Sequence, residues 1–135
     1  MVFIGGPRQV GKTTLSLSLL GPNTKINSLA YLNWDSLVDR EQILGQKIPS
    51  RQKIVVFDEI HKYARWRGLV KGLFDKNRNE VNFIVTGSAR LDHFSKGGDS
   101  LQGRYHYYRL HPFSLGEISK HASKSDVDIL FKLGG

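Results

Sequence analysis

The first residues that could do chemistry form a glycine-rich loop near the N-terminus. The run Gly6-Pro7-Arg8-Gln9-Val10-Gly11-Lys12-Thr13 fits G-x-x-x-x-G-K-[ST], a pattern in which backbone N–H groups and a lysine surround phosphates. We expect Lys12 to reach the β- and γ-phosphates of a nucleotide and the Thr13 hydroxyl to bind Mg²⁺. A strand-to-helix turn without a ligand is the alternative. The residues predicted to contact the nucleotide are Gly6, Pro7, Arg8, Gln9, Val10, Gly11, Lys12, Thr13 and Thr14.

Two adjacent carboxylates form a second candidate group. Asp58 and Glu59 follow the apolar run 54–57, whose lack of alternation is typical of a strand buried on both faces. Ligands of open α/β sheets bind at the carboxyl ends of strands, so these acids and the loop are expected at one edge. We predict that Asp58 holds Mg²⁺ and that Glu59 orients the water that attacks the γ-phosphate. Two solvated acids after a core strand are the alternative.

A hydroxyl after a further buried strand could lie beside that water. Ser88 ends the buried strand expected over residues 81–88, and we prefer it to Thr86 as a residue that senses the γ-phosphate. Either hydroxyl could instead cap the turn that follows. The five histidines, at positions 61, 93, 106, 111 and 121, lack the spacing of metal ligands, and we interpret all of them as structural or surface residues.

Strand-like and helix-like segments alternate along the chain, which favours an α/β fold with a parallel sheet. In the helix after the loop, Leu15 and Leu19 share one face. Asp35 is the expected cap of the second helix, and Ser114 and Glu117 have capping-box spacing. Strands are expected over residues 2–4, 29–34, 54–57, 81–88 and 105–110, and helices over residues 14–20, 35–44, 66–74 and 125–133.

The charge of the chain favours anionic partners. Its net charge is +8, and basic residues are concentrated between Lys62 and Arg78, on a segment with helical periodicity. That basic helix is a candidate DNA or RNA contact, although a solvated helix face is the commoner explanation of such a run. There is no cysteine, and no apolar run approaches the roughly 18 residues of a membrane span. We therefore predict a cytoplasmic protein without a membrane span.

Four motifs in a fixed order resemble those of a known family. The chain resembles the prokaryotic AAA-type ATPases whose ATPase core precedes a C-terminal domain of unknown function. The resemblance implies an α/β, three-layer P-loop NTPase fold of AAA type, with a five-stranded parallel sheet flanked by helices and the phosphate-loop strand central. It also implies an ATPase core over residues 1–113 and the start of an incomplete helical lid over 114–135, in a fragment that binds Mg-ATP weakly. The motifs are residues 6–14, 56–60, 85–89 and 101–104, followed by the stretch 112–117.

The resemblance further implies a role for Arg104, which precedes the last core strand, where AAA modules carry an arginine finger. Such an arginine reaches the γ-phosphate of a neighbouring subunit, which would require self-association; a local ion pair is the alternative. With Lys12, Glu59, Ser88 and Arg104 as catalytic residues, the prediction is Mg²⁺-dependent hydrolysis of ATP. The other hypothesis is a nucleotide-gated module that binds DNA or RNA with negligible turnover.

Overall fold

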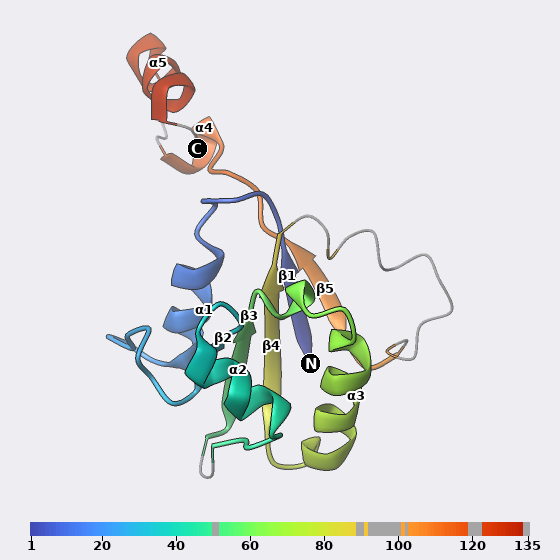
Figure 1. Cartoon of the computed structure of the whole chain (residues 1–135). Coiled ribbons are helices and arrows are strands. Elements are labelled where there is room, and N and C mark those ends of the chain that lie inside the picture. Colours follow the sequence, from blue (N-terminus) through green and yellow to red (C-terminus); the bar gives the residue numbers. More distant parts are fainter. Residues whose placement is uncertain (50–51, 89–90, 92–100, 102, 119–122, 134–135) are drawn as a thin grey trace.

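The computed structural model places five strands in one sheet with helices on both of its faces (Figure 1). It describes residues 1–49, 52–88, 91, 101, 103–118 and 123–133. The strands are β1 (Val2–Gly5), β2 (Tyr31–Asn33), β3 (Ile54–Asp58), β4 (Asn82–Gly87) and β5 (His106–Arg109). The α-helices are α1 (Lys12–Leu20), α2 (Leu37–Leu44), α3 (Trp66–Asn77), α4 (Leu115–Ile118) and α5 (Lys124–Leu133), and one 3₁₀ turn, η1, spans Ile60–Lys62.

The strands follow the order β2-β3-β4-β1-β5, and every neighbouring pair is parallel. The predicted five-stranded parallel sheet flanked by helices is therefore confirmed. The expectation that the phosphate-loop strand is central is wrong, because β4 is the middle strand and β1 lies between β4 and β5. Strand β4 has five successive buried residues, from Phe83 to Gly87, and so suits the most covered position. Strand β1 is nevertheless paired on both sides, which fixes the start of the glycine-rich loop.

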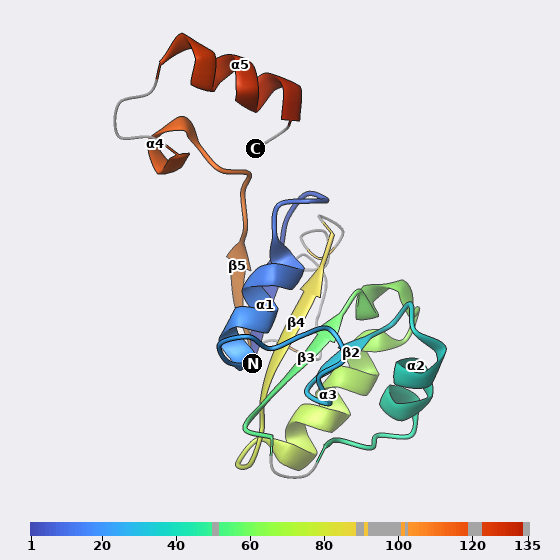
Figure 2. The same ribbon diagram turned by 90° about the vertical axis from the view of Figure 1, so that its left-hand side faces the viewer.

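Helix α1 covers one face of the sheet, and α2 and α3 cover the other, as the two views in Figures 1 and 2 show. The larger core lies under α2 and α3, where Phe57 and Phe83 stack with ring centroids 5.4 Å apart. Apolar residues recur at helical spacing at positions 66, 69, 70, 73 and 74, which predicts that this face of α3 packs on the sheet. Trp66, Val70 and Leu73 are buried there, and Leu69 and Phe74 are partly buried against the same core.

Helix α1 does not contact the sheet through the face that carries Leu15 and Leu19. Ser16 is fully buried, and Leu17 packs against the smaller core. Leu15 and Leu19 are instead 36% and 48% exposed, on the side of the helix toward β5. The small Ser16 side chain allows α1 to lie close to the sheet, and its hydroxyl donates to the carbonyl of Lys12 at 2.9 Å. The leucine pair is thus left for the surface beside the loop.

Several element boundaries differ from the sequence prediction by a few residues, and two of the differences concern named residues. Helix α2 is capped by Ser36 rather than Asp35, since the Ser36 hydroxyl accepts a hydrogen bond from the Asp39 amide. The basic run 62–78 does not form one helix: Lys62 belongs to η1, and α3 ends at Asn77, with Arg78 as its C-cap. Lys62 therefore does not lie on the helix that carries Arg67 and Lys71.

Helices α4 and α5 lie beyond the carboxyl edge of the sheet, on the side of the glycine-rich loop (Figures 1 and 2). The Glu117 carboxylate accepts from the Ser114 amide at 2.8 Å, which is half of the predicted capping box. In the part of the chain that the structure describes, no helix has the length and apolar character needed to cross a membrane. The division into residues 1–113 and 114–135 stays a prediction.

Candidate functional site

The glycine-rich loop and the two carboxylates face one pocket at the carboxyl edge of the sheet. The loop connects β1 to α1, and the acids lie at the end of β3. The pocket has a volume of about 420 Å³. It is lined by Arg8, Gln9, Gly11, Lys12, Thr13, Thr14, Asp58 and Glu59. The structure therefore brings the two predicted motifs together, as expected for strands that end at the same edge.

Lys12 is buried beneath the loop, with 8% of its surface exposed. Its ammonium group donates to the backbone carbonyl of Gly6 at 3.1 Å and to that of Pro7. The first N–H groups of α1, which begins at Lys12, lack acceptors within the helix. A buried cation, free amides and the positive end of the helix dipole together favour an anion at this position.

The carboxylate of Asp58 accepts three hydrogen bonds from other side chains of the site. Asp58 is 4% exposed, and its Oδ2 accepts a hydrogen bond from Thr13 Oγ1 at 3.1 Å. The hydroxyl of Tyr31, on β2, donates to the same oxygen, and the hydroxyl of Thr86, on β4, donates to Oδ1. Burial, and then the hydrogen bond to Asp58, raise the pKa of Tyr31 well above its ordinary value. Three neighbouring elements thus hold the carboxylate of Asp58 toward α1.

Sequence reasoning missed Tyr31 as a site residue, although a signal was present. Tyr31 is paired with Val56 across the β2–β3 ladder, so it shares a face with Val56 and Asp58. A tyrosine two positions before the end of a strand, in a segment otherwise rich in apolar residues, needs a partner for its hydroxyl when it is buried. Without the strand order, the sequence could not show that this partner is Asp58.

Glu59 directly follows β3 and adopts a left-handed backbone with φ of 57°. This conformation is uncommon for residues other than glycine and recurs at functional sites. Its amide donates to the Thr86 carbonyl at 3.1 Å, and its carboxylate lies 3.4 Å from the Lys62 ammonium. Lys62 also pairs with Asp35 at 2.5 Å, and that contact raises the pKa of Lys62. Glu59 is therefore a partly exposed carboxylate at the pocket, with a cation beside it.

Ser88 and Thr86 take different positions. Thr86 is fully buried against Asp58, whereas the Ser88 hydroxyl shares a hydrogen bond of 3.2 Å with His61 Nε2. His61, interpreted from the sequence as a structural or surface residue, has a side chain only 6% exposed and lies 3.9 Å from the Glu59 carboxylate. It therefore contacts two predicted site residues. Of the other histidines, those at 106 and 111 are exposed, and those at 93 and 121 lie outside the described residues.

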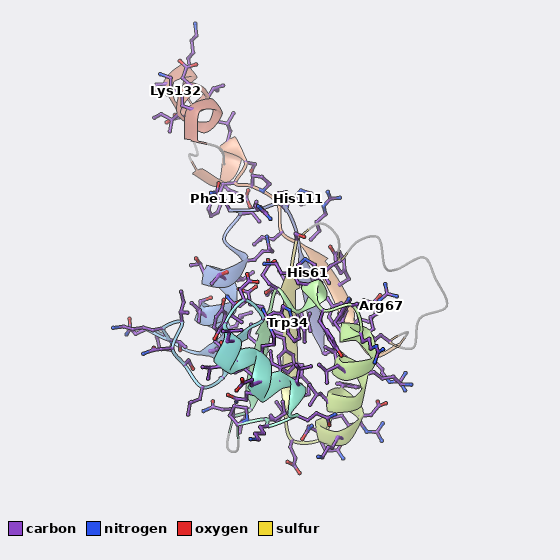
Figure 3. The ribbon with its side chains drawn as sticks, in the orientation of Figure 1. Trp34, His61, Arg67, His111, Phe113 and Lys132 are labelled. Atoms are coloured by element: carbon purple, nitrogen blue, oxygen red, sulfur yellow. The ribbon has the colours of Figure 1, made fainter. Side chains whose placement is uncertain are left out.

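A second, more apolar pocket of about 500 Å³ adjoins the loop. Its walls include Val10 and Leu15 on one side and Leu110 and Phe113, from the segment after β5, on the other. Phe113 is 66% exposed and lies next to the loop (Figure 3). The loop approaches this segment closely, because a Cβ at Gly6 would lie 2.2 Å from the Leu110 carbonyl oxygen. A glycine at position 6 therefore allows the two walls to meet.

Arg104 lies at the opposite edge of the sheet from the pocket. It precedes β5, which runs parallel to β1, and the amino group of Met1 donates to its carbonyl at 3.1 Å. Its guanidinium Nε donates to the carboxylate of Asp75, on α3, at 3.0 Å. Within one subunit Arg104 is thus distant from the loop and paired locally, which was the alternative reading. Its action in a neighbouring subunit stays a prediction, as does nucleic-acid binding by the segment 62–78.

The residues at the first pocket fit a magnesium ion held together with phosphates. Among the described residues, no three His, Asp or Glu side chains gather as a metal cage. Mg²⁺ in nucleotide sites needs none, since it takes one or two protein oxygens and completes its shell with phosphates and water. The Thr13 hydroxyl and the Asp58 carboxylate, 3.1 Å apart at the pocket, supply that number of hard oxygen ligands.

The parallel α/β sheet, with a phosphate loop between β1 and α1 and acids at the end of β3, defines a P-loop NTPase fold. The model of the AAA domain family matches residues 1–119, and the chain belongs to this family. Membership indicates a nucleotide-binding function of the ATPase type in general. A search of curated proteins found no match.

Proposed function

We propose that the protein binds ATP and hydrolyses it in a Mg²⁺-dependent reaction. The observation that carries this proposal is the convergence of Lys12, Thr13, Asp58 and Glu59 on one pocket of about 420 Å³. A loop that only turned the chain from strand to helix would not require a buried lysine and a paired threonine and aspartate at its mouth. In one pocket the site would hold hydrogen-bond donors that bind phosphate, oxygen ligands that bind a cation and a carboxylate that orients water.

In the proposed reaction, a water oxygen forms a bond to the γ-phosphorus while the bond to the β–γ bridging oxygen breaks, which yields ADP and phosphate. Lys12 would exchange its loop carbonyls for phosphate oxygens, and Glu59 would orient the water and accept its proton. Thr13 and Asp58 would hold Mg²⁺, whose charge offsets that of the phosphates when it is bound. Ser88 would sense the γ-phosphate, and Arg104 would act on a neighbouring subunit.

The second pocket would take the base of the nucleotide. It directly adjoins the loop, and its walls are mostly apolar, as suits the flat faces of a purine. Phe113 offers an exposed aromatic ring beside the loop, and stacking between a base and an aromatic side chain contributes about 1–3 kcal/mol. This use of the pocket also accounts for the partly exposed Leu15 on α1.

The experiment measures ATP turnover and the affinity for Mg-ATP of matched variants. Lys12→Ala should lose nucleotide binding. Glu59→Gln should retain binding but lose about 10²–10⁴-fold in kcat, since it removes the proton acceptor. Lys25→Ala and Glu41→Gln, both at exposed positions outside the site, are the matched controls. Normal hydrolysis by Glu59→Gln, or normal binding by Lys12→Ala, would contradict the proposal.

The same titration tests the base pocket. Phe113→Ala should weaken Mg-ATP binding about tenfold or more, because it removes the stacking surface. The affinity for inorganic triphosphate, which has no base, should stay unchanged. An equal loss for both ligands would show that Phe113 supports the loop instead of the base.

A further inference from the structure

The side chain of His61 is 6% exposed and contacts both Glu59 and Ser88, two residues proposed to act in the reaction. From its sequence context, His61 has no predicted role in that reaction. We infer that His61 is a positioning residue, which ties the carboxylate of Glu59 to the hydroxyl of Ser88. The inference rests on the proposed ATP hydrolysis, and it adds to that reaction a residue outside both phosphate-binding motifs. His61 lies at the carboxyl edge of the sheet, on the turn η1 (Figure 3).

The contacts of His61 link two strands. Its Nε2 lies 3.2 Å from Ser88 Oγ, just after β4, and 3.9 Å from Glu59 Oε2, just after β3. The first distance is that of a hydrogen bond, whereas the second is too long for a hydrogen bond and is a close polar contact. One ring nitrogen therefore lies next to both the group proposed to orient water and the group proposed to sense the γ-phosphate.

The fold provides a fitted space for this ring. A Cβ at position 87 would lie 2.6 Å from His61 Nδ1, so the glycine at the end of β4 leaves the room that the imidazole occupies. On the other side, the left-handed backbone of Glu59 starts η1 and turns His61 back toward β4. The side chain is 6% exposed, so its position is set by packing and not by solvent.

The arrangement limits the freedom of the catalytic carboxylate. The Lys62 ammonium lies 3.4 Å from the same Glu59 oxygen that faces His61, and Lys62 is itself held by Asp35 at 2.5 Å. Lys62 is an exposed, mobile type of side chain, whereas the imidazole is buried and rigid. His61 is therefore the buried neighbour through which we expect the positions of Glu59 and Ser88 to be linked. Displacement of a positioned group by about 1 Å can cost about 10²-fold in rate.

The test compares two substitutions at position 61 in the whole chain. His61→Leu fills the space but removes the polar contact, and it should lower kcat for ATP about 10²-fold with little change in the affinity for Mg-ADP. His61→Gln places an amide near the position of Nε2 and should recover most of that rate. His106→Leu and His106→Gln, at an exposed position on β5, are the matched controls. A thermal unfolding curve for each variant separates loss of rate from loss of fold.

A double-mutant cycle tests the link itself. If His61 acts through Ser88, the His61→Leu, Ser88→Ala double variant should be no slower than the slower single variant. Multiplied losses would overturn the link. An unchanged kcat in His61→Leu, or equal rates in His61→Leu and His61→Gln, would overturn the positioning role.

A measurement without nucleotide keeps this inference separate from the proposed function. In protein labelled with ¹⁵N-histidine, Ser88→Ala should shift the imidazole resonances of His61, identified by their loss in His61→Gln, and Ser125→Ala should not. An unmoved resonance would overturn the inferred contact whether or not ATP is hydrolysed. A shifted resonance in a protein that turns over no ATP would instead overturn the proposed function, and with it the positioning role.

Discussion

The hydrogen bond from Tyr31 to Asp58 leads to a prediction for folding stability. Tyr31→Phe removes one hydroxyl and keeps the ring, which packs against the smaller core at 2% exposure. Asp58 would still accept from Thr13 on Oδ2 and from Thr86 on Oδ1. The carboxylate of Asp58 therefore keeps two partners. An unpaired buried charge, which would cost about 3–5 kcal/mol of unfolding free energy, does not arise. The expected loss is that of one hydrogen bond to a charged group, about 1.5–3 kcal/mol of unfolding free energy.

Urea denaturation followed by circular dichroism measures this loss. The midpoint should fall while the slope with denaturant stays constant, because the surface exposed on unfolding is unchanged. In a thermal scan the same loss corresponds to roughly 5–10 °C in Tm for a chain of this length.

Tyr108→Phe is the matched control, since Tyr108 is 60% exposed on the same face of the sheet. It should change the unfolding free energy by no more than about 0.5 kcal/mol. A Tyr31→Phe protein as stable as its parent would refute the view that Tyr31 holds Asp58 in place. Additive losses in a Tyr31→Phe, Thr86→Val double variant would argue against one shared carboxylate network.

Two further predictions concern the loop and the capped turn that follows β5. Gly6→Ala should destabilise the fold by about 1–3 kcal/mol, because its Cβ would lie 2.2 Å from the Leu110 carbonyl oxygen. Gly72→Ala is the control: it lies on α3 with open space around its Cβ and should stabilise the fold by about 0.5–1 kcal/mol. Equal urea midpoints for the two variants would contradict this prediction. The carboxylate of Glu117 accepts a hydrogen bond from the Ser114 amide, which lowers the pKa of Glu117 below its ordinary value of 4.5. The cap is therefore present at neutral pH and is lost as the pH falls through that lowered pKa. The NMR shift of the Ser114 amide should titrate with a midpoint below 4.5, and a midpoint at or above that value would exclude the bond in solution.

The sequence was sufficient to predict the elements that carry strong periodic or motif signals. The four apolar residues before Asp58 predict a doubly buried strand, and β3 is buried from Val55 onward. The recurrence of Trp66, Val70 and Leu73 predicts the buried face of α3. The glycine-rich pattern and the paired acids are predicted to lie at the same edge of the sheet, and residues of both line one pocket there. In each case a local pattern is enough, because burial on both faces or on one helical stripe leaves a direct trace in the sequence.

The parts that the sequence did not predict depend on which elements become neighbours. Leu15 and Leu19 have helical spacing, yet Ser16 faces the sheet, because close approach of α1 to the strands favours a small residue there. His61 has no motif of its own, since its contacts come from Ser88, 27 positions along the chain. Periodicity reports that a face is buried, but it does not report what covers it.

Strand register explains why Asp58 and Thr86 meet while Glu59 has a separate set of partners. Asp58 is paired with Thr86 across the β3–β4 ladder, so both side chains point to the α1 face, where Thr13 lies in the first turn of that helix. The next residue along a strand points to the opposite face. Glu59 leaves the strand at that point through its left-handed backbone, and its carboxylate meets His61 and Lys62 from η1 in place of α1. One step along the chain therefore separates the carboxylate that we propose to hold a cation from the carboxylate that we propose to orient water.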